Sequence, residues 1–141
     1  MIKIQKKEFN IEKEINFIKS QHSNVGATSI FVGYVRDYNN KKIVKSINLE
    51  VYEKMAFKAL EEVCEKAMRK WNLIDTLIIH RYGNLKINEK IVLVASFSIH
   101  RKESFESCDF LMNYLKKEAP FWKKENYKES YQWLENSNDR N

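Results

Sequence analysis

Two lysines on either side of the chain's only proline are the residues best placed to act on an anionic substrate. Pro120 has no backbone N–H and its ring clashes with the preceding turn, so the helix before it must end near residues 118–119. Lys116 lies on that last turn, and Lys123 follows an aromatic pair at 121–122 that we expect to hold the chain by burial. This arrangement predicts two ammonium groups in one pocket.

A histidine and two arginines stand at predicted strand ends and are suited to binding phosphate. His100 and Arg101 follow one strand directly before a helix, and Arg36 ends another strand. A guanidinium group offers forked donors that match phosphate oxygens. Taken alone, His100 could equally be a structural residue and Arg36 a solvated side chain. His80 and Arg81 repeat the pair, but the isoleucines before them indicate a buried strand in which His80 is structural.

Motifs of several common enzyme classes are missing from the sequence. It contains no glycine-rich phosphate loop, no His-Glu-x-x-His pair and no Gly-x-Ser-x-Gly elbow, so nucleotide hydrolysis, zinc proteolysis and serine hydrolase chemistry have no support. Cationic side chains remain, and a lysine whose pKa is lowered by burial or by a neighbouring cation can transfer protons near neutral pH. Lys41, Lys42 and Lys117 are instead expected to be solvated.

Hydrophobic periodicity predicts the elements that position these groups. They are a helix capped by Asn10, a strand at 26–35, a strand at 46–52, a helix at 56–71, strands at 75–81 and 89–100, and a helix at 104–118. The polar connection at 36–42 is expected to be a mobile loop, and the two strands before the last helix are expected to pair antiparallel. The pattern indicates an α+β fold in which helices pack on a mainly antiparallel sheet.

Length and composition indicate one domain, 1–141, with a polar tail from about residue 136 that frays. Hydrophobic residues make up 43% and charged residues 31%, which is typical of a folded soluble protein. The sequence has neither an apolar run of about 18 residues nor a signal peptide, so we expect a cytoplasmic protein. The net charge of +6 favours an acidic partner or an anionic ligand. Cys64 and Cys108 fall on apolar helix stripes, which favours core packing over a disulfide or a metal site.

Several short motifs, taken in their order, resemble a known family. They are Val35-Arg36-Asp37, Glu50-Val51-Tyr52, Ile79-His80-Arg81-Tyr82-Gly83, His100-Arg101, Tyr114-Leu115-Lys116 and Ala119-Pro120-Phe121-Trp122-Lys123-Lys124-Glu125. Together they resemble the large, catalytic subunit of molybdopterin synthase, the MoaE family, over about residues 26–135. The Ala-Pro-Phe-Trp-Lys segment, which follows a helix ending in Tyr-Leu-Lys, is the most specific part of this resemblance.

The resemblance implies an α/β hammerhead subunit that forms a homodimer and binds two copies of a small ubiquitin-like sulfur carrier, a MoaD-like protein, in a heterotetramer. The carrier's C-terminal Gly-Gly thiocarboxylate would enter a pocket on this chain. There two sulfurs would pass to cyclic pyranopterin monophosphate, forming the dithiolene of molybdopterin in molybdenum cofactor biosynthesis. We expect no cofactor and no metal on this subunit, because molybdenum would be inserted only after the dithiolene exists, and we expect no contact with nucleic acid or membrane.

The resemblance also assigns site residues by motif position. Lys116 and Lys123 would be the catalytic pair, acting as general acid and base, and Lys116 could alternatively form a transient acyl link to the carrier. The substrate-binding residues would be Tyr34, Val35, Arg36, His100, Arg101, Lys124 and Glu125. Among them Arg36, His100 and Arg101 are expected to bind the phosphate and pterin, and Glu125 either orients Lys123 or stabilises its loop.

Two other functions remain open from the sequence. A small basic nucleic-acid-binding domain would use Lys41, Lys42, Lys45 and the basic and aromatic cluster at 116–128. Interleaved glutamates and the lack of a recognition motif weigh against it. The second alternative is a homologue that binds the carrier without catalysing the reaction, against which the presence of both lysines argues.

Overall fold

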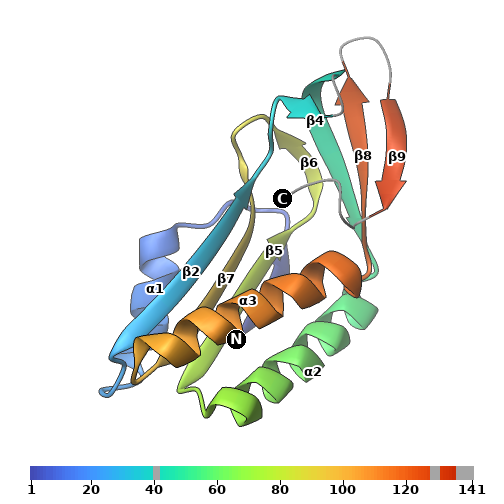
Figure 1. Cartoon of the computed structure of the whole chain (residues 1–141). Helices are drawn as coiled ribbons and strands as arrows, with labels where there is room; N and C mark the ends of the chain where they lie inside the picture. The colour runs from blue at the N-terminus through green and yellow to red at the C-terminus, as the bar shows by residue number, and fades with distance from the viewer. Residues whose placement is uncertain (40–41, 128–130, 136–141) are drawn as a thin grey trace.

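The computed structural model describes residues 1–39, 42–127 and 131–135 (Figure 1). Its helices are α1 (Ile11–Ser20), α2 (Glu53–Trp71) and α3 (Arg101–Lys117). Its strands are β1 (Ile2–Gln5), β2 (Ala27–Tyr34), β3 (Tyr38–Asn39), β4 (Lys42–Val51), β5 (Asp75–Arg81), β6 (Gly83–Lys86), β7 (Lys90–Ser98), β8 (Phe121–Tyr127) and β9 (Tyr131–Glu135). None of the described helices has both the length and the apolar composition needed to cross a membrane.

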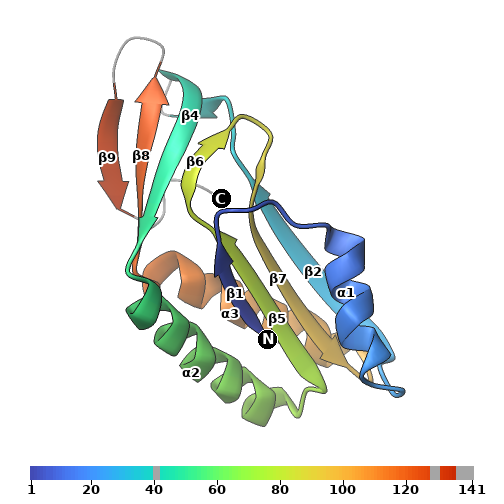
Figure 2. The ribbon, with the colours of Figure 1, turned by 180° about the vertical axis from the view of Figure 1, so that it is seen from behind.

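The first sheet has the strand order β1-β5-β7-β2. The β1–β5 pair is parallel, whereas β5–β7 and β7–β2 are antiparallel. The antiparallel pairing of β5 with β7 was expected, since these are the two predicted strands before the last helix. Helices α2 and α3 lie on one face of this sheet, and α1 lies on the other (Figures 1 and 2). β2 is an outer strand of the described sheet, and α3 packs beside it.

Each face of the first sheet contributes to a separate hydrophobic core. Val92 and Val94 of β7 belong to the core under α2 and α3, whereas Leu93, Ala95 and Phe97 belong to the core under α1. This alternation follows from the two-residue period of a strand and explains why β7 is a nearly continuous apolar run. The inner strands β5 and β7 are therefore buried on both sides.

The second sheet carries the chain segment that follows α3. Its order is β3-β4-β8-β9, and β6 also pairs with β4. In the antiparallel register of β4 and β8, Val51 lies opposite Phe121 and Leu49 lies opposite Lys123. Leu49 also lies opposite Gly83 of β6. β8 thus begins where α3 ends and takes its position from β4.

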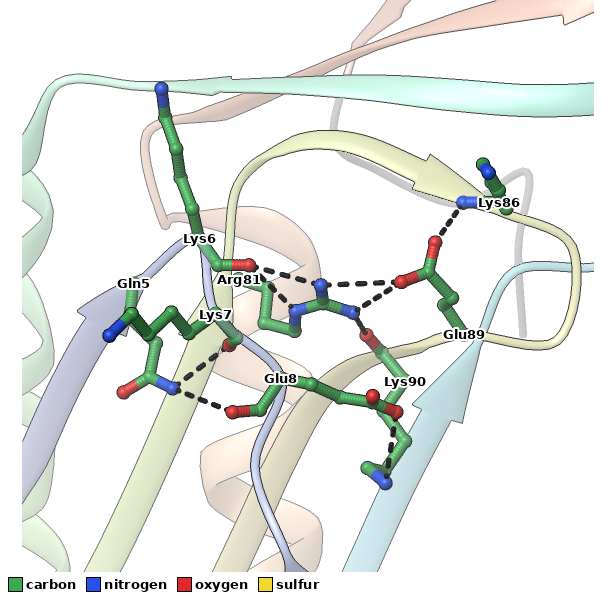
Figure 3. Close-up of polar contacts among 8 residues, drawn as sticks. All are labelled: Gln5, Lys6, Lys7, Glu8, Arg81, Lys86, Glu89 and Lys90. Atoms are coloured by element: carbon green, nitrogen blue, oxygen red, sulfur yellow. Dashed lines mark hydrogen bonds and ion pairs between the residues drawn. The ribbon is translucent and has the colours of Figure 1, made fainter.

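A buried arginine fastens the N-terminal segment to the first sheet (Figure 3). The Arg81 guanidinium donates two hydrogen bonds to the Lys6 carbonyl oxygen, at 3.1 and 3.0 Å, and one to the Lys90 carbonyl oxygen at 2.9 Å. It also pairs with the Glu89 carboxylate at 3.4 Å, and Glu89 accepts a hydrogen bond from the Lys86 N–H. Arg81 is therefore a structural residue that joins three chain segments at the end of β5.

The sequence correctly predicts the α+β class, the helices and the longer strands, but several boundaries move and short strands were missed. α2 begins at Glu53 and α3 at Arg101, three residues earlier than predicted in each case, because the charged first turns show no apolar period. The predicted loop at 36–42 contains β3, with residues 40–41 outside the described chain. β1, β6, β8 and β9 were not predicted, and the expected polar tail from 136 lies outside the described residues.

Candidate active site

A groove between α3 and β2 contains the candidate catalytic Lys116. It has a volume of about 490 Å³, and it is lined by Thr28, Ile30 and Phe31 of β2 and by Phe105, Met112 and Lys116 of α3, among others. The α3 residues recur every three or four positions, which places them on one helix face. Lys116 is partly buried at the end of this stripe. Part of the groove wall is therefore apolar, and Lys116 places a cation at its end.

Two polar residues of the same groove were not predicted to belong to a site. Asp109 and Asn113 line it together with Lys116, and the Asn113 side-chain amide donates a hydrogen bond to the Asp109 carboxylate at 3.4 Å. Their positions seven and three residues before Lys116 put them on its helix face. That spacing is the sequence signal that would have identified them.

The thiol of Cys108 also lines the groove but is not a nucleophile. Cys108 is buried, and its sulfur lies 3.8 Å from the Val94 carbonyl oxygen. Burial raises the pKa of the Cys108 thiol to about 11. Because only a thiolate attacks efficiently, this cysteine packs as a small apolar residue, as the sequence predicts.

The end of α3 is placed as the single proline requires. Lys116 and Lys117 occupy the last turn, and the backbone N–H of Glu118 donates to the Tyr114 carbonyl oxygen at 2.8 Å. The chain then passes Pro120 and enters β8, so the expected helix end is confirmed.

Lys123 lies on β8 with only 5% of its surface exposed. The strand register places it between Leu49 of β4 and Leu134 of β9. A charged ammonium group in such a site interacts with an anion more strongly than it would in water, because the local dielectric constant is lower. Phe121, two residues earlier on the same face, is buried as well, as the sequence predicts, whereas its neighbour Trp122 is only partly buried.

The end of β2 provides the next group of candidate residues. Tyr34 is the last residue of β2 and is about half exposed, whereas Arg36 is exposed just beyond it. Val35 between them is buried in the core of the second sheet, and its backbone is held by hydrogen bonds with Glu89 and Asn88 at 3.0 and 2.9 Å. The structure therefore offers the side chains of Tyr34 and Arg36, rather than that of Val35, to a ligand.

His100 and Arg101 form the start of α3, and both are exposed. The segment before β2 packs closely against the residue that precedes them, because a Cβ at Gly26 would lie 2.1 Å from the Ile99 carbonyl oxygen. Among the described residues, no side chain caps this helix at His100. The first N–H groups of α3, beside the guanidinium of Arg101, are thus the kind of group that can bind an anion.

One chain does not bring all the candidate residues together. α3 has 17 residues, so its ends lie about 25 Å apart. Arg101 is at its first residue and Lys116 is on its last turn. β2 and α3 start at the same end of the sheet and run in the same general direction, so Tyr34 and Arg36 lie toward the Lys116 end (Figure 1). His100 and Arg101 stand at the opposite end.

The last two candidates can be placed by their backbone alone. Lys124 lies opposite Asn48 and Glu125 opposite Ile47 in the β8–β4 register. The side chains of Lys124 and Glu125 lie outside the described part of the structure.

His80 is a buried residue of β5, as the sequence predicts. Its ring stacks on Phe121, with centroids 3.7 Å apart and planes inclined by 17°. Its Nδ1 donates to the Arg81 carbonyl oxygen at 2.9 Å, since a carbonyl only accepts. Burial lowers the pKa of His80 to about 4, so the ring is neutral at physiological pH.

Comparison with known proteins gives one consistent family. The family model described as "MoaE protein" matches residues 4–118. The molybdopterin synthase catalytic subunit of Ralstonia nicotianae is 43% identical over 134 residues, which cover 95% of this chain and 76% of the relative. The corresponding subunit of Pseudomonas aeruginosa is 42% identical, with 95% of this chain and 89% of the relative covered.

Solved structures agree with the sequence comparison. The molybdopterin biosynthesis MoaE protein from Burkholderia ambifaria superposes with a TM-score of 0.86 at 40% identity, covering 98% of this chain and 90% of that chain. A molybdopterin synthase structure from Staphylococcus aureus superposes with a TM-score of 0.87 at 29% identity, covering 94% of this chain and 95% of that chain. Both likenesses extend over nearly the whole chain.

Proposed function

This chain belongs to the MoaE family, the catalytic subunits of molybdopterin synthase, and we propose that it transfers two sulfurs from a carrier's C-terminal thiocarboxylate to cyclic pyranopterin monophosphate. Membership makes it a sulfur-transferring enzyme of molybdenum cofactor biosynthesis. The observation that carries the finer proposal is the groove that ends at Lys116, followed along the chain by the buried Lys123. The proposed partner is a small ubiquitin-like carrier whose extended Gly-Gly tail reaches Lys116.

Charge neutralisation explains why lysines suit this reaction. A thiocarboxylate and a phosphate repel each other, and fixed cations beside both lower the energy of their approach. Opening the cyclic phosphate and releasing the carrier as a carboxylate both require proton transfers, for which Lys116 and Lys123 are the candidate acid and base. A transient acyl link between the carrier and Lys116 is the other route open to the same residue.

We further propose that two copies of the chain join along β2. This eight-residue outer strand carries Ile30, which is 45% exposed, and it lies beside Phe105 of α3, which is 65% exposed. A long outer strand with exposed apolar side chains can pair with a strand of another chain. Antiparallel pairing of β2 with its own copy, across a two-fold axis, would cover it and continue the sheet.

Such a dimer would complete the active site. Because β2 and α3 run in the same direction, a two-fold axis through the β2 pair brings the start of one α3 toward the end of the other. His100 and Arg101 of the second copy would then reach the side of Tyr34, Arg36 and Lys116 of the first. The open helix start beside Arg101 would bind the substrate phosphate. Two carriers on this dimer give the proposed heterotetramer.

We propose a cytoplasmic location, where the two cysteines, both free thiols in the structure, stay reduced. The alternative of a nucleic-acid-binding domain is not favoured, since family membership accounts for the motifs that contain the basic residues.

A reconstituted reaction tests the proposed function. The protein is mixed with a thiocarboxylated carrier and cyclic pyranopterin monophosphate, and molybdopterin is measured as its fluorescent oxidised derivative. We expect product with the loaded carrier and none with the same carrier ending in a carboxylate. Absence of product with a carrier shown by mass to be loaded would contradict the proposal.

A further inference from the structure

A stacked pair of rings connects the first sheet to the start of the strand that carries Lys123. His80 belongs to β5 and Phe121 is the first residue of β8, and their ring centroids are 3.7 Å apart with planes inclined by 17°. His80 is 7% exposed and Phe121 is 2% exposed. The contact is therefore a fixed junction in the interior rather than a surface contact between side chains that can turn away.

The His80 ring is held on the β5 side of this junction. β5 is an inner strand, and the backbone of His80 lies between Ile4 of β1 and Val92 of β7. The 2.9 Å hydrogen bond from Nδ1 to the Arg81 carbonyl oxygen fixes the plane of the ring. Arg81 itself is anchored through its guanidinium to the carbonyl oxygens of Lys6 and Lys90 (Figure 3). The His80 ring is thus held in one orientation, in which it stacks on Phe121. An aliphatic side chain could not stack in this way.

Phe121 connects the His80 ring to Lys123 through the backbone of β8. It is the first strand residue after the chain reversal at Pro120, and it lies opposite Val51 at the start of the β4–β8 register. Lys123 is two residues further on the same face, about 7 Å along the strand. A shift of Phe121 would therefore move Lys123 as well, because both residues lie at the start of β8 and the rest of the strand follows them.

We propose that His80 is a positioning residue for Lys123, acting through its stack on Phe121. The proposal rests on the proposed function, in which Lys123 is one of the catalytic pair. His80 does not touch the substrate, so its loss should lower turnover without weakening binding. A misplacement of about 1 Å at a catalytic group can lower the rate by about 10²-fold, which sets the size of the effect.

The test compares His80→Ala with Ile79→Ala. Ile79 is its neighbour on β5, is fully buried and packs into the α1 core, on the face away from β8. Both changes remove a buried side chain, and both proteins are assayed where thermal unfolding shows them to be folded. We expect His80→Ala to lower kcat by about 10²-fold with KM values within about twofold of wild type, and Ile79→Ala to keep kcat. His80→Phe, which keeps a stacking ring, should recover most of the lost kcat.

A second measurement does not depend on the reaction. Amide hydrogen exchange of β8 should become faster in His80→Ala and unchanged in Ile79→Ala, even if no molybdopterin is formed by any variant. Phe121→Leu, which removes the stack from the other side, should reproduce the kcat loss if His80→Ala does not fold. Equal kcat and equal β8 exchange in His80→Ala and Ile79→Ala, or no recovery in His80→Phe, would overturn the proposal. A wild-type protein without activity would instead refute the proposed function.

Discussion

Arg101 is the first residue of α3 and Lys116 is on its last turn, so nearly the full length of one helix separates these two cations. A site within one chain therefore cannot use both residues, and a site that does use both must be built from two chains. The β2 edge with its exposed Ile30 provides a surface on which two chains can meet. The two ends of α3 can therefore be tested separately, by substitutions at Lys116 and at Arg101.

Lys116→Ala should nearly abolish sulfur transfer while the protein remains folded. Lys116 is partly buried at a helix end, where truncation changes the free energy of unfolding by only about 0.5 kcal/mol. Single-turnover formation of molybdopterin and the thermal unfolding midpoint are measured together. Lys117→Ala, an exposed lysine on the same turn, is the matched control and should behave like wild type. A full single-turnover rate in Lys116→Ala would show that this lysine is not catalytic.

Arg101→Ala should weaken the binding of cyclic pyranopterin monophosphate. Loss of a charged hydrogen bond to phosphate costs about 1.5–3 kcal/mol, so KM should rise about 10- to 100-fold while kcat changes little. Steady-state kinetics at varied substrate give both constants. Lys102→Ala changes the next exposed cation and should leave KM near the wild-type value. If both variants raise KM equally, a general loss of positive charge rather than Arg101 itself explains the effect.

Ile30→Lys should separate the proposed dimer. A lysine on an outer strand opposes pairing with another strand, because its charge would have to be buried. Sedimentation at fixed protein concentration should show a smaller species, and molybdopterin formation should fall with it. Ile43→Lys on β4 changes another exposed isoleucine, 55% exposed against 45% for Ile30, and should leave assembly intact. A dimer that persists in Ile30→Lys would show that the interface does not lie at β2.

The stability of the fold should depend on pH through His80. The pKa of His80 is about 4 in the folded chain and about 6.5 when the chain is unfolded. Between these values the unfolded chain binds more protons, so stability is complete above pH 6.5 and is lost as the pH falls toward 4. The loss amounts to about 3 kcal/mol from this residue, because one pKa unit corresponds to about 1.36 kcal/mol.

Urea unfolding at several pH values measures this contribution. Carboxylates affect wild type and His80→Phe alike, so the difference in unfolding free energy between the two proteins isolates the histidine. The difference should change by about 3 kcal/mol in favour of His80→Phe between pH 7 and pH 4. Parallel pH profiles for the two proteins would mean that His80 is already able to take a proton in the folded state.

Local signals in the sequence were enough for part of the fold. Asn10 and the isoleucine spacing predict α1, and Pro120 predicts the end of α3, because caps and chain breakers act within a few residues. β1 and β8 could not be found this way. β1 has only four residues, and the charged β8 segment becomes a strand through its pairing with β4, which is a tertiary effect.

The sequence predicted the residue types of the candidate site better than it predicted how these residues are arranged in space. The position of Lys116 followed from the helix period, and the burial of His80 followed from the apolar run before it. The separation of Arg101 from Lys116 was already implied by a predicted helix between them, since each helical residue adds about 1.5 Å. The stack of His80 on Phe121 joins distant parts of the chain, and nothing in either local sequence predicts it.

A mixed dimer tests the central claim, a sulfur-transfer site shared between two copies, most directly. Lys116→Ala and Arg101→Ala chains are coexpressed with different tags, the mixed dimer is purified through both tags, and turnover is measured at substrate concentrations below saturation. One site then carries both substitutions and the other carries neither, so the rate should be about half that of wild type, far above either variant homodimer. A mixed dimer as impaired as the two homodimers would place both residues in the same chain's site and contradict the account.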